Sequence, residues 1–226
     1  MVFRKTGVFR EAITRRSAPL IDGAASAALA TALAVFLESG ARTLRIIDVG
    51  GACGAHYFAL RALLPLTLQL HWLVVETPAM AARAQDFSGD ELRFFDDFAT
   101  AREVLGPPDL IHSSGTLQYV PEPYDLLHEM TNSGARFLLF SRLLLTAEPA
   151  DFATVQESRL SDNGPGSLPT GMTDGLCRYP HNYLRRAAIE TALKKDHALL
   201  LEWNDGAVCH GERLVEKRAY WLKHVR

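Results

Sequence analysis

The chain has 226 residues, 48% of them hydrophobic and 22% charged, which is enough to bury a sizeable core and predicts one domain with an elaboration. Its formal net charge of −2 excludes a broad basic surface for binding nucleic acid. The three cysteines are odd in number, far apart and outside any zinc-ligand spacing, so they are expected to be reduced thiols in a cytoplasmic protein.

Residues 1–43 precede the first clear strand pattern. Residues 1–16 are basic, and residues 24–37 are almost wholly apolar and rich in alanine. The apolar stretch is too short to span a membrane, and no small-residue cleavage site follows it, so a signal peptide is not expected. It predicts a helix packed on the domain, capped by Asp22 and ended at Gly40. The basic leader is interpreted as a flexible arm or as part of a lid.

Residues 44–57 read LRIIDVGGACGAHY and predict a strand, a glycine-rich turn and the start of a helix. Glycines suit such a turn because they accept positive φ and let a ligand lie against the backbone, beside the unpaired N–H groups of the helix. Asp48 lies inside the strand, two residues before the first glycine. A pyrophosphate-binding loop has no use for a carboxylate there, whereas a ligand with an ammonium group does. Asp48 is therefore predicted to face such a ligand.

Strand and helix patterns alternate from residue 44 to the end of the chain. This alternation predicts a doubly wound α/β fold with a mostly parallel, seven-stranded sheet in residues 44–226. Strands are expected at residues 44–49, 70–75, 92–95, 109–113, 136–145, 198–203 and 218–224. Helices are expected at residues 56–64, 79–85, 121–130 and 182–195.

Between residues 146 and 180 the sequence changes character. It contains two clusters of turn-forming residues, DNGPG at 162–166 and PTG at 169–171, which predict a long functional or mobile loop. In an open parallel sheet, ligands bind beyond the carboxyl ends of the strands, and a loop that leaves the fifth strand begins on that side. An insert of about residues 146–181 is therefore predicted to be the lid of an acceptor site.

The motif IIDVGGACG, residues 46–54, resembles the first motif of class I S-adenosylmethionine-dependent methyltransferases, with Ala52 in place of one glycine. A wider ordered set, DVGGACGAHYF, HWLVVETPAM, DLIHSSGTLQYVPEP, TVQ and YPHNYL, is similar to a family of methyltransferases associated with bacterial surface-polysaccharide gene clusters. The resemblance implies a Rossmann-like methyltransferase fold with S-adenosylmethionine as cofactor. It also implies O-methylation of a sugar or a sugar-containing intermediate of surface glycan biosynthesis.

The candidate cofactor residues lie mostly at the ends of predicted strands. Glu76 ends the second strand, in register with the glycine turn, and its carboxylate can accept both ribose hydroxyls. The resemblance implies that an acid after the third strand approaches the adenine amino group; either Asp96 or Asp97 fits, and the other is expected to cap a helix. Ser113 and Ser114 leave the fourth strand toward the same cleft. The predicted cofactor-binding set is Asp48, Gly50, Gly51, Ala52, Gly54, Tyr57, Glu76, Thr77, Asp96, Asp97, Ser113 and Ser114.

Transfer of a sulfonium methyl group needs little activation, so the protein has mainly to position an acceptor oxygen and, optionally, to remove its proton. The candidate bases are His181, Tyr119, His56 and His112. His181, at the end of the predicted lid, is best placed for an acceptor, although a helix-capping role fits its position equally well. His112 lies mid-strand and is interpreted as a packed structural histidine. This chemistry requires no metal. The residues predicted to bind acceptor hydroxyls are Gln156, Tyr179 and Asn182.

Two other functions compete with this interpretation. A dinucleotide-binding fingerprint, G-x-G-x-x-G, can be aligned with Gly50, Ala52 and Ala55, with Glu76 near the distance expected for the acid that follows. That alignment leaves Asp48 without a partner, which favours the methyltransferase. The second alternative is a donor-binding protein that has lost catalysis. No cofactor motif is broken, which counts against it.

Overall fold

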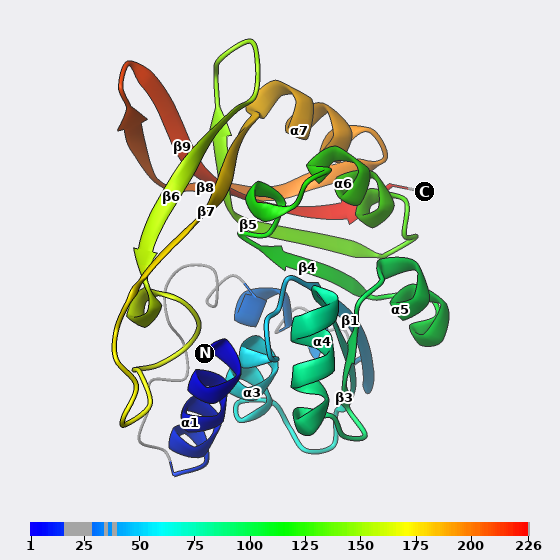
Figure 1. Ribbon diagram of the computed structural model, residues 1–226. Helices are drawn as coiled ribbons and strands as arrows, with labels where there is room; N and C mark the ends of the chain where they lie inside the picture. Colours follow the sequence, from blue (N-terminus) through cyan, green and yellow to red (C-terminus); the bar gives the residue numbers. More distant parts are fainter. Residues whose placement is uncertain (16–28, 34–35, 38–39, 226) are drawn as a thin grey trace.

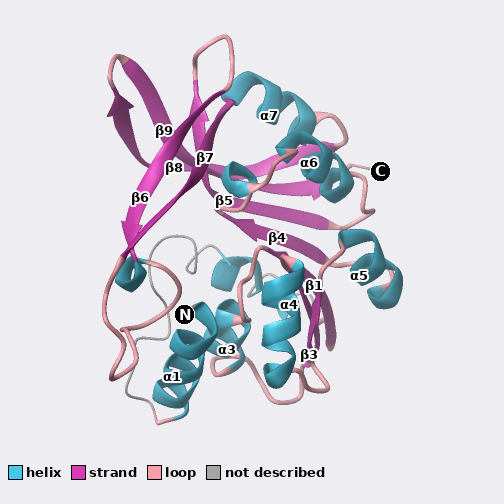
Figure 2. Cartoon of the chain, viewed as in Figure 1, coloured by secondary structure: helices cyan, strands magenta, loops and turns pink. Residues whose placement is uncertain are grey.

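A nine-stranded sheet runs through the molecule, with helices packed on both of its faces (Figures 1 and 2). The structure is a computed structural model that describes residues 1–15, 29–33, 36–37 and 40–225. Its strands are β1 Thr43–Val49, β2 Gln69–Val75, β3 Leu92–Phe95, β4 Leu110–Ser114, β5 Phe137–Thr146, β6 Phe152–Arg159, β7 Leu176–Arg185, β8 His197–His210 and β9 Arg213–His224. Its labelled helices are α1 Val2–Thr14, α3 Ala55–Arg61, α4 Pro78–Ala84, α5 Phe98–Leu105, α6 Pro123–Thr131 and α7 Arg186–Lys194.

The five strands predicted first in the chain are parallel and lie in the order β3-β2-β1-β4-β5. β9 runs antiparallel beside β5, and β8 runs antiparallel beside β9. All seven predicted strands are therefore present. The prediction of a seven-stranded, mostly parallel sheet is nevertheless wrong, because the sheet is mixed and has nine strands. The added strands, β6 and β7, form an antiparallel pair that joins the sheet where the end of β7 meets the end of β5.

The segment predicted as a long loop, residues 146–181, contains most of this added strand pair. β6 pairs along its whole length with residues 176–183 of β7, and the connection between the two strands covers only residues 160–175. Half-buried and exposed residues alternate along β6, which is the period of two that a strand requires. The predicted start of the last helix at residue 182 is also wrong, because residues 182–185 complete β7 and α7 begins at Arg186.

The basic N-terminal segment forms helix α1, which packs on α3 and α4. Lys5 of α1 is fully buried, and its ammonium group donates hydrogen bonds to the carbonyl oxygens of Ser161 and Asn163, each at 2.8 Å. Helix α1 is thereby fastened to the connection 160–175, and Figure 1 shows the two side by side. Of the two interpretations of the leader, a flexible arm and part of a lid, this contact favours the second.

The alanine-rich helix predicted before the first strand is described at residues 29–33 and 36–37. Gly40, predicted to end it, has a φ of +76°, a conformation that glycine adopts without steric cost. The predicted cap, Asp22, lies outside the described residues. Within the described ranges, no helix is both long enough and apolar enough to cross a membrane.

Two apolar clusters cover the two faces of the sheet. Successive residues of β1 alternate between them, since Ile46 belongs to one cluster and Ile47 to the other. The first cluster packs the sheet against residues 29–37, as far as they are described, and against α3 and α4. The second packs it against α5, α6 and α7. Because both faces are closed by apolar side chains, the polar residues at the carboxyl ends of the strands are left for a ligand.

Candidate active site

The turn between β1 and α3 has the backbone that its glycines predict. Gly50 and Gly54 have φ values of +76° and +80°, and Ala52 between them has a φ of +53°. A Cβ atom on Gly50 would lie 2.0 Å from Oγ1 of Thr116, whose hydroxyl donates to the carbonyl oxygen of Val49 at 2.9 Å. The first glycine is therefore required by packing as well as by conformation. Ala52 takes a positive φ that a residue with a Cβ atom seldom adopts.

Asp48 does not face an open cleft, which corrects the prediction that it binds a cationic ligand directly. Its carboxylate is fully buried behind the turn and accepts hydrogen bonds from His112 Nδ1 at 2.8 Å and from His56 Nδ1 at 3.2 Å. Trp72 Nε1 donates to the same carboxylate at 3.4 Å. A Cβ atom on Gly51 would lie 2.4 Å from Oδ2 of Asp48. The Asp48 carboxylate thus packs against Gly51 and supports the glycine turn from the protein interior.

This arrangement removes the sequence reasoning that set the methyltransferase above a dinucleotide-binding protein, since Asp48 has partners of its own. Burial alone raises the pKa of Asp48, but the neighbouring His56 and His112 lower it more, so the net pKa lies below its ordinary value. Burial lowers the pKa of His112, and the interpretation of His112 as a packed histidine agrees with its full burial. The sequence reasoning missed this cluster because it depends on the register of β1 and β4, in which Asp48 lies opposite His112.

The ligand atoms of Asp48, His56 and His112 all lie within 4.8 Å of one another, so the three residues could hold a metal ion. Their nitrogen–oxygen distances of 2.8 and 3.2 Å are those of hydrogen bonds. A zinc ion would have to part these atoms and bind each at about 2.0–2.2 Å. The contacts in the structure are therefore explained by a hydrogen-bonded carboxylate.

Glu76 lies against the glycine turn, where the sequence predicts it. Its Oε1 atom accepts the backbone N–H of Ala52 at 2.9 Å, and its Oε2 atom accepts the N–H of Thr77 at 3.0 Å. Burial raises the pKa of Glu76, and these two hydrogen bonds oppose the rise. The Thr77 side chain is exposed at the same edge of the sheet. The carboxylate is thus held at the carboxyl end of β2, beside the turn that approaches a ligand.

The structure separates the two acids that follow β3. Asp97 is the N-cap of α5, and its Oδ2 atom accepts hydrogen bonds from the backbone N–H and the hydroxyl of Thr100, both at 2.7 Å. These hydrogen bonds lower the pKa of Asp97. Asp96 is exposed, and no hydrogen bond or ion pair of its carboxylate is found among the described residues. Asp97 is therefore the acid that caps the helix, as expected for one of the two, and Asp96 is the acid that remains available to a ligand.

The two serines at the end of β4 differ in their surroundings. Ser113 is fully buried, and its hydroxyl has no hydrogen-bond partner among the described residues. Ser114 is half-buried and accepts a hydrogen bond from the Ser141 hydroxyl at 3.0 Å. Ser114 therefore lies nearer to the solvent-facing edge of the sheet, whereas Ser113 faces its interior.

Four of the five predicted catalytic and acceptor-binding residues come together. The Tyr119 hydroxyl, from the short turn Leu117–Tyr119, donates to Gln156 Oε1 of β6 at 3.0 Å. The Tyr119 ring lies 5.0 Å from the His181 ring and 5.6 Å from the Tyr179 ring, measured between centroids, and both belong to β7. Asn182 is the exception, because its side chain donates to the carbonyl oxygen of Val120 at 3.3 Å. The cluster joins the end of β4 to the β6–β7 pair.

His181 is 1% exposed, and neither ring nitrogen has a hydrogen-bond partner among the described residues. Its ring packs against Tyr119 and Tyr183. Burial and, to a smaller extent, His210 lower the pKa of His181 below its ordinary value of 6.5, so the imidazole is neutral at pH 7. A helix-capping role is wrong, because α7 begins after Arg185, four residues later. Burial raises the pKa of Tyr119, so its phenol keeps its proton at neutral pH.

Arg142 is a candidate that the sequence reasoning missed. It lies in β5 where the pairing with β9 shifts register between Phe140 and Leu143, and its φ is +56°. The residue is exposed, and its guanidinium group forms no ion pair within the described part of the chain. The available signal was a single arginine inside the apolar run FLLFSRLLLT.

Neither the protein-family models nor the curated proteins include a match to this sequence. Solved structures do match. A methyltransferase from Clostridium acetobutylicum is 13% identical, with a TM-score of 0.56 and coverage of 99% of each chain. The N-terminal domain of EvdMO1, in the presence of S-adenosylhomocysteine and D-fucose, is 22% identical, with a TM-score of 0.52 and coverage of 91% of this chain and 85% of that one. The fold is that of S-adenosylmethionine-dependent methyltransferases. The sugar N-methyltransferase KedS8 from Streptoalloteichus is 16% identical, with a TM-score of 0.54 and coverage of 91% and 89%.

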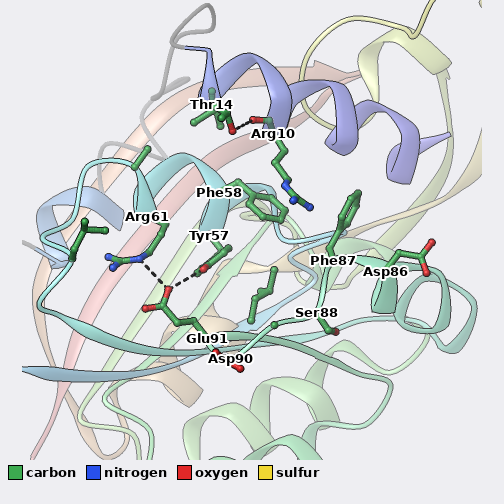
Figure 3. Close-up of a pocket in the computed structure, with 15 residues that line it drawn as sticks. Arg10, Thr14, Tyr57, Phe58, Arg61, Asp86, Phe87, Ser88, Asp90 and Glu91 are labelled. Carbon is green, nitrogen blue, oxygen red and sulfur yellow. Dashed lines mark hydrogen bonds and ion pairs between the residues drawn. The ribbon is translucent and has the colours of Figure 1, made fainter.

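The methyltransferase fold brings its ligands to the carboxyl ends of the strands, and Tyr57 points elsewhere. A cavity of about 960 Å³ lies between α1, α3 and residues 86–92 (Figure 3). Inside it the Tyr57 hydroxyl donates to Glu91 Oε2 at 2.9 Å, and Arg61 Nε pairs with the same oxygen at 2.9 Å. This cavity is at the amino end of β3, opposite the edge that carries Glu76 and Asp96. The Tyr57 hydroxyl is thus bonded away from that edge, and its role as a cofactor residue stays a prediction.

The two roles, a ligand contact for Asp96 and a helix N-cap for Asp97, can be tested by paired substitutions. Asp97→Ala removes an N-cap and should destabilise the protein by about 1 kcal/mol, which lowers its melting temperature by roughly 2–4 °C. Its affinity for S-adenosylhomocysteine should not change. Asp96→Ala should show the reverse, with an unchanged melting temperature and weaker binding by calorimetry. Weaker binding in the Asp97 variant alone would exchange the two roles.

Proposed function

We propose that this protein is an S-adenosylmethionine-dependent O-methyltransferase whose acceptor is a sugar or a sugar-containing intermediate of surface glycan biosynthesis. The observation that carries the proposal is the position of Glu76, a carboxylate held beside the glycine turn at the carboxyl end of β2. There it can accept the two hydroxyls of a ribose, with Asp96 at the next strand end for the adenine amino group. The methyltransferase fold supports this assignment over a dinucleotide-binding protein.

A sugar acceptor is supported by the cluster of polar side chains that joins the segment after β4 to strands β6 and β7. Tyr119, Gln156 and Tyr179 offer hydroxyl and amide groups, which bind sugar hydroxyls. Two of the similar structures are connected with sugars: the EvdMO1 domain was crystallised in the presence of D-fucose, and KedS8 is a sugar N-methyltransferase.

In this mechanism S-adenosylmethionine supplies an electrophilic methyl group, and the chain positions the acceptor and accepts its proton. Glu76 and Asp96 would hold the cofactor beside the backbone of the glycine turn. Tyr119 remains protonated at neutral pH because burial raises its pKa. Its O–H donates to Gln156 Oε1, so its oxygen can accept a hydrogen bond from an acceptor hydroxyl. His181 is neutral because burial lowers its pKa, so a free ring nitrogen takes the proton of the acceptor hydroxyl.

Thermal melting with two ligands tests the cofactor assignment. S-adenosylhomocysteine at a hundred times its dissociation constant should stabilise the native state by about 2.7 kcal/mol, which corresponds to a rise in melting temperature of roughly 5–10 °C. NAD should produce no shift. A shift from NAD, and none from S-adenosylhomocysteine at millimolar concentration, would contradict the proposal and support an oxidoreductase.

Turnover is a separate question from binding. A methyl-release assay with S-adenosylmethionine and a panel of sugar acceptors should give product that depends on the acceptor. Binding of S-adenosylhomocysteine without release on any acceptor would support the alternative of a donor-binding partner protein. Methylation of an amino sugar in preference to its hydroxyl analogue would support the assignment as a methyltransferase. It would change the proposed acceptor atom from oxygen to nitrogen.

A further inference from the structure

Arg142 is held in an unfavourable backbone conformation in the middle of β5, one residue after Ser141, which pairs with the last residue of β4. Its φ of +56° is one that residues other than glycine seldom adopt and that concentrates at ligand-binding sites. The amide of Gln118 donates to the Arg142 carbonyl oxygen at 3.1 Å. Opposite lies Gly115, where an added Cβ atom would lie 3.5 Å from both Cβ and Nε of Arg142. Neighbouring residues therefore leave space for this side chain and hold its backbone.

The guanidinium group of Arg142 also lacks a counter-ion. Other arginines near the β5 and β7 ends are paired with acids: Arg185 with Asp151 at 3.4 Å, Arg186 with Glu216 at 2.7 Å, and Arg218 with Glu216 at 3.0 Å. Among the described residues no acid pairs with Arg142. An arginine that is conformationally strained and electrically unpaired indicates a partner that the chain itself does not supply.

The unpaired charge lies beside the acceptor cluster. Burial raises the pKa of Tyr119, and the positive charge of Arg142 offsets part of that rise. The two side chains are therefore close enough to interact electrostatically, and Tyr119 connects onward to Gln156. One site thus combines a fixed cation with hydroxyl and amide groups.

We propose that Arg142 binds an anionic group of the acceptor, so that the substrate is a sugar that carries a phosphate or a carboxylate. A guanidinium group binds either anion through two parallel hydrogen bonds, while Tyr119 and Gln156 bind the sugar hydroxyls. The proposal rests on the proposed function and extends it, since it names the chemical class of the acceptor. Both sources of negative charge, a sugar phosphate and a sugar acid, fit the same contact.

The test is calorimetry of the full chain saturated with S-adenosylhomocysteine, titrated with glucose, glucose 1-phosphate, glucuronate and a nucleoside diphosphate glucose. At least one anionic sugar should bind the wild type about tenfold tighter than glucose, the size of one charge-assisted contact. The anion that binds best identifies the source. Arg142→Gln should abolish the preference and leave affinity for S-adenosylhomocysteine within about threefold. Arg102→Gln removes the same charge from the exposed face of α5 and should keep the preference.

Arg142→Gly controls for folding. Glycine adopts a positive φ without steric cost, so this variant should melt at or above the wild-type temperature and still lose the preference for anionic sugars. A lower melting temperature with the preference retained would show that Arg142 has a structural role and overturn the proposal. So would equal affinity of the wild type for glucose and every anionic sugar, or weaker S-adenosylhomocysteine binding in Arg142→Gln, which would assign the guanidinium to the cofactor carboxylate. If S-adenosylhomocysteine fails to bind the wild type, the proposed function is contradicted. The same sugar titrations, carried out without S-adenosylhomocysteine, then measure the anion preference on its own.

Discussion

Replacing His181 with alanine should lower the rate of methyl transfer about a hundredfold, which is the usual contribution of a general base. Both ring nitrogens of His181 are buried and have no partner among the described residues, and a buried polar atom without a partner is unfavourable unless a ligand supplies one. Because His181 belongs to β7 and not to the glycine turn, affinity for S-adenosylhomocysteine should stay within about threefold. Single-turnover methyl transfer and calorimetry measure the two quantities.

His197 is a matched control for this experiment. It is also buried with two ring nitrogens that lack partners in the described chain, and burial lowers its pKa too. It lies at the start of β8, away from the acceptor cluster. His197→Ala should therefore change stability about as much as His181→Ala and leave the rate unchanged. If both variants lose only a few fold in rate, His181 is a packing residue and the acceptor is simply positioned, with Tyr119 as the nearest hydroxyl.

The pH dependence of the wild type gives a second readout for His181. Its pKa in the folded protein lies below 6.5 because of burial, so the base form is present throughout the neutral range. The rate should be flat above pH 6.5 and should fall as the pH drops through the lowered pKa. His181→Ala should lose this acidic limb. An unchanged profile in the variant would assign the limb to another group.

The parallel part of the fold was predictable because its sequence signals are local. Each of the first five strands is an apolar run that ends in a polar or turn-forming residue, and these bounds agree with the structure within one residue. The carboxyl ends of parallel strands meet at one edge, so Glu76 and the acid after β3 could be placed without knowing any contact. Which acid caps α5 depended on two hydrogen bonds, from the backbone N–H and the hydroxyl of Thr100 to Asp97, which the residue types do not specify.

The β6–β7 pair was missed because its turn formers are conspicuous and its strand pattern is weak. Neither strand has an apolar run, and Pro180 lies within β7. Proline is tolerated there because that part of β7 has a single neighbouring strand and need not donate on its free side. The partners of Asp48 were missed for a different reason: they come from α3 and β4, and their approach depends on register and helix orientation.

Replacing Glu76 with alanine should weaken S-adenosylhomocysteine by about 2 kcal/mol, or roughly thirtyfold, because two ribose hydroxyls lose a charged acceptor. Calorimetry of the folded variant measures this loss directly. The expected size exceeds that of a neutral hydrogen bond because the Glu76 carboxylate is half-buried at the edge of the glycine turn. Competing water is therefore reduced at this position.

Glu76 also accepts the N–H groups of Ala52 and Thr77, so the substitution could act through the shape of the turn. Glu76→Gln distinguishes the two effects, since its amide oxygen can still accept one of these backbone groups but cannot accept both ribose hydroxyls. If Glu76 binds the ribose, Glu76→Gln should melt near the wild-type temperature and still bind S-adenosylhomocysteine at least tenfold more weakly. If Glu76 only supports the turn, Glu76→Gln should recover most of the affinity that Glu76→Ala loses. Full affinity in both variants would contradict the position proposed for the ribose at the end of β2. It would also contradict the cofactor site proposed for this edge of the sheet.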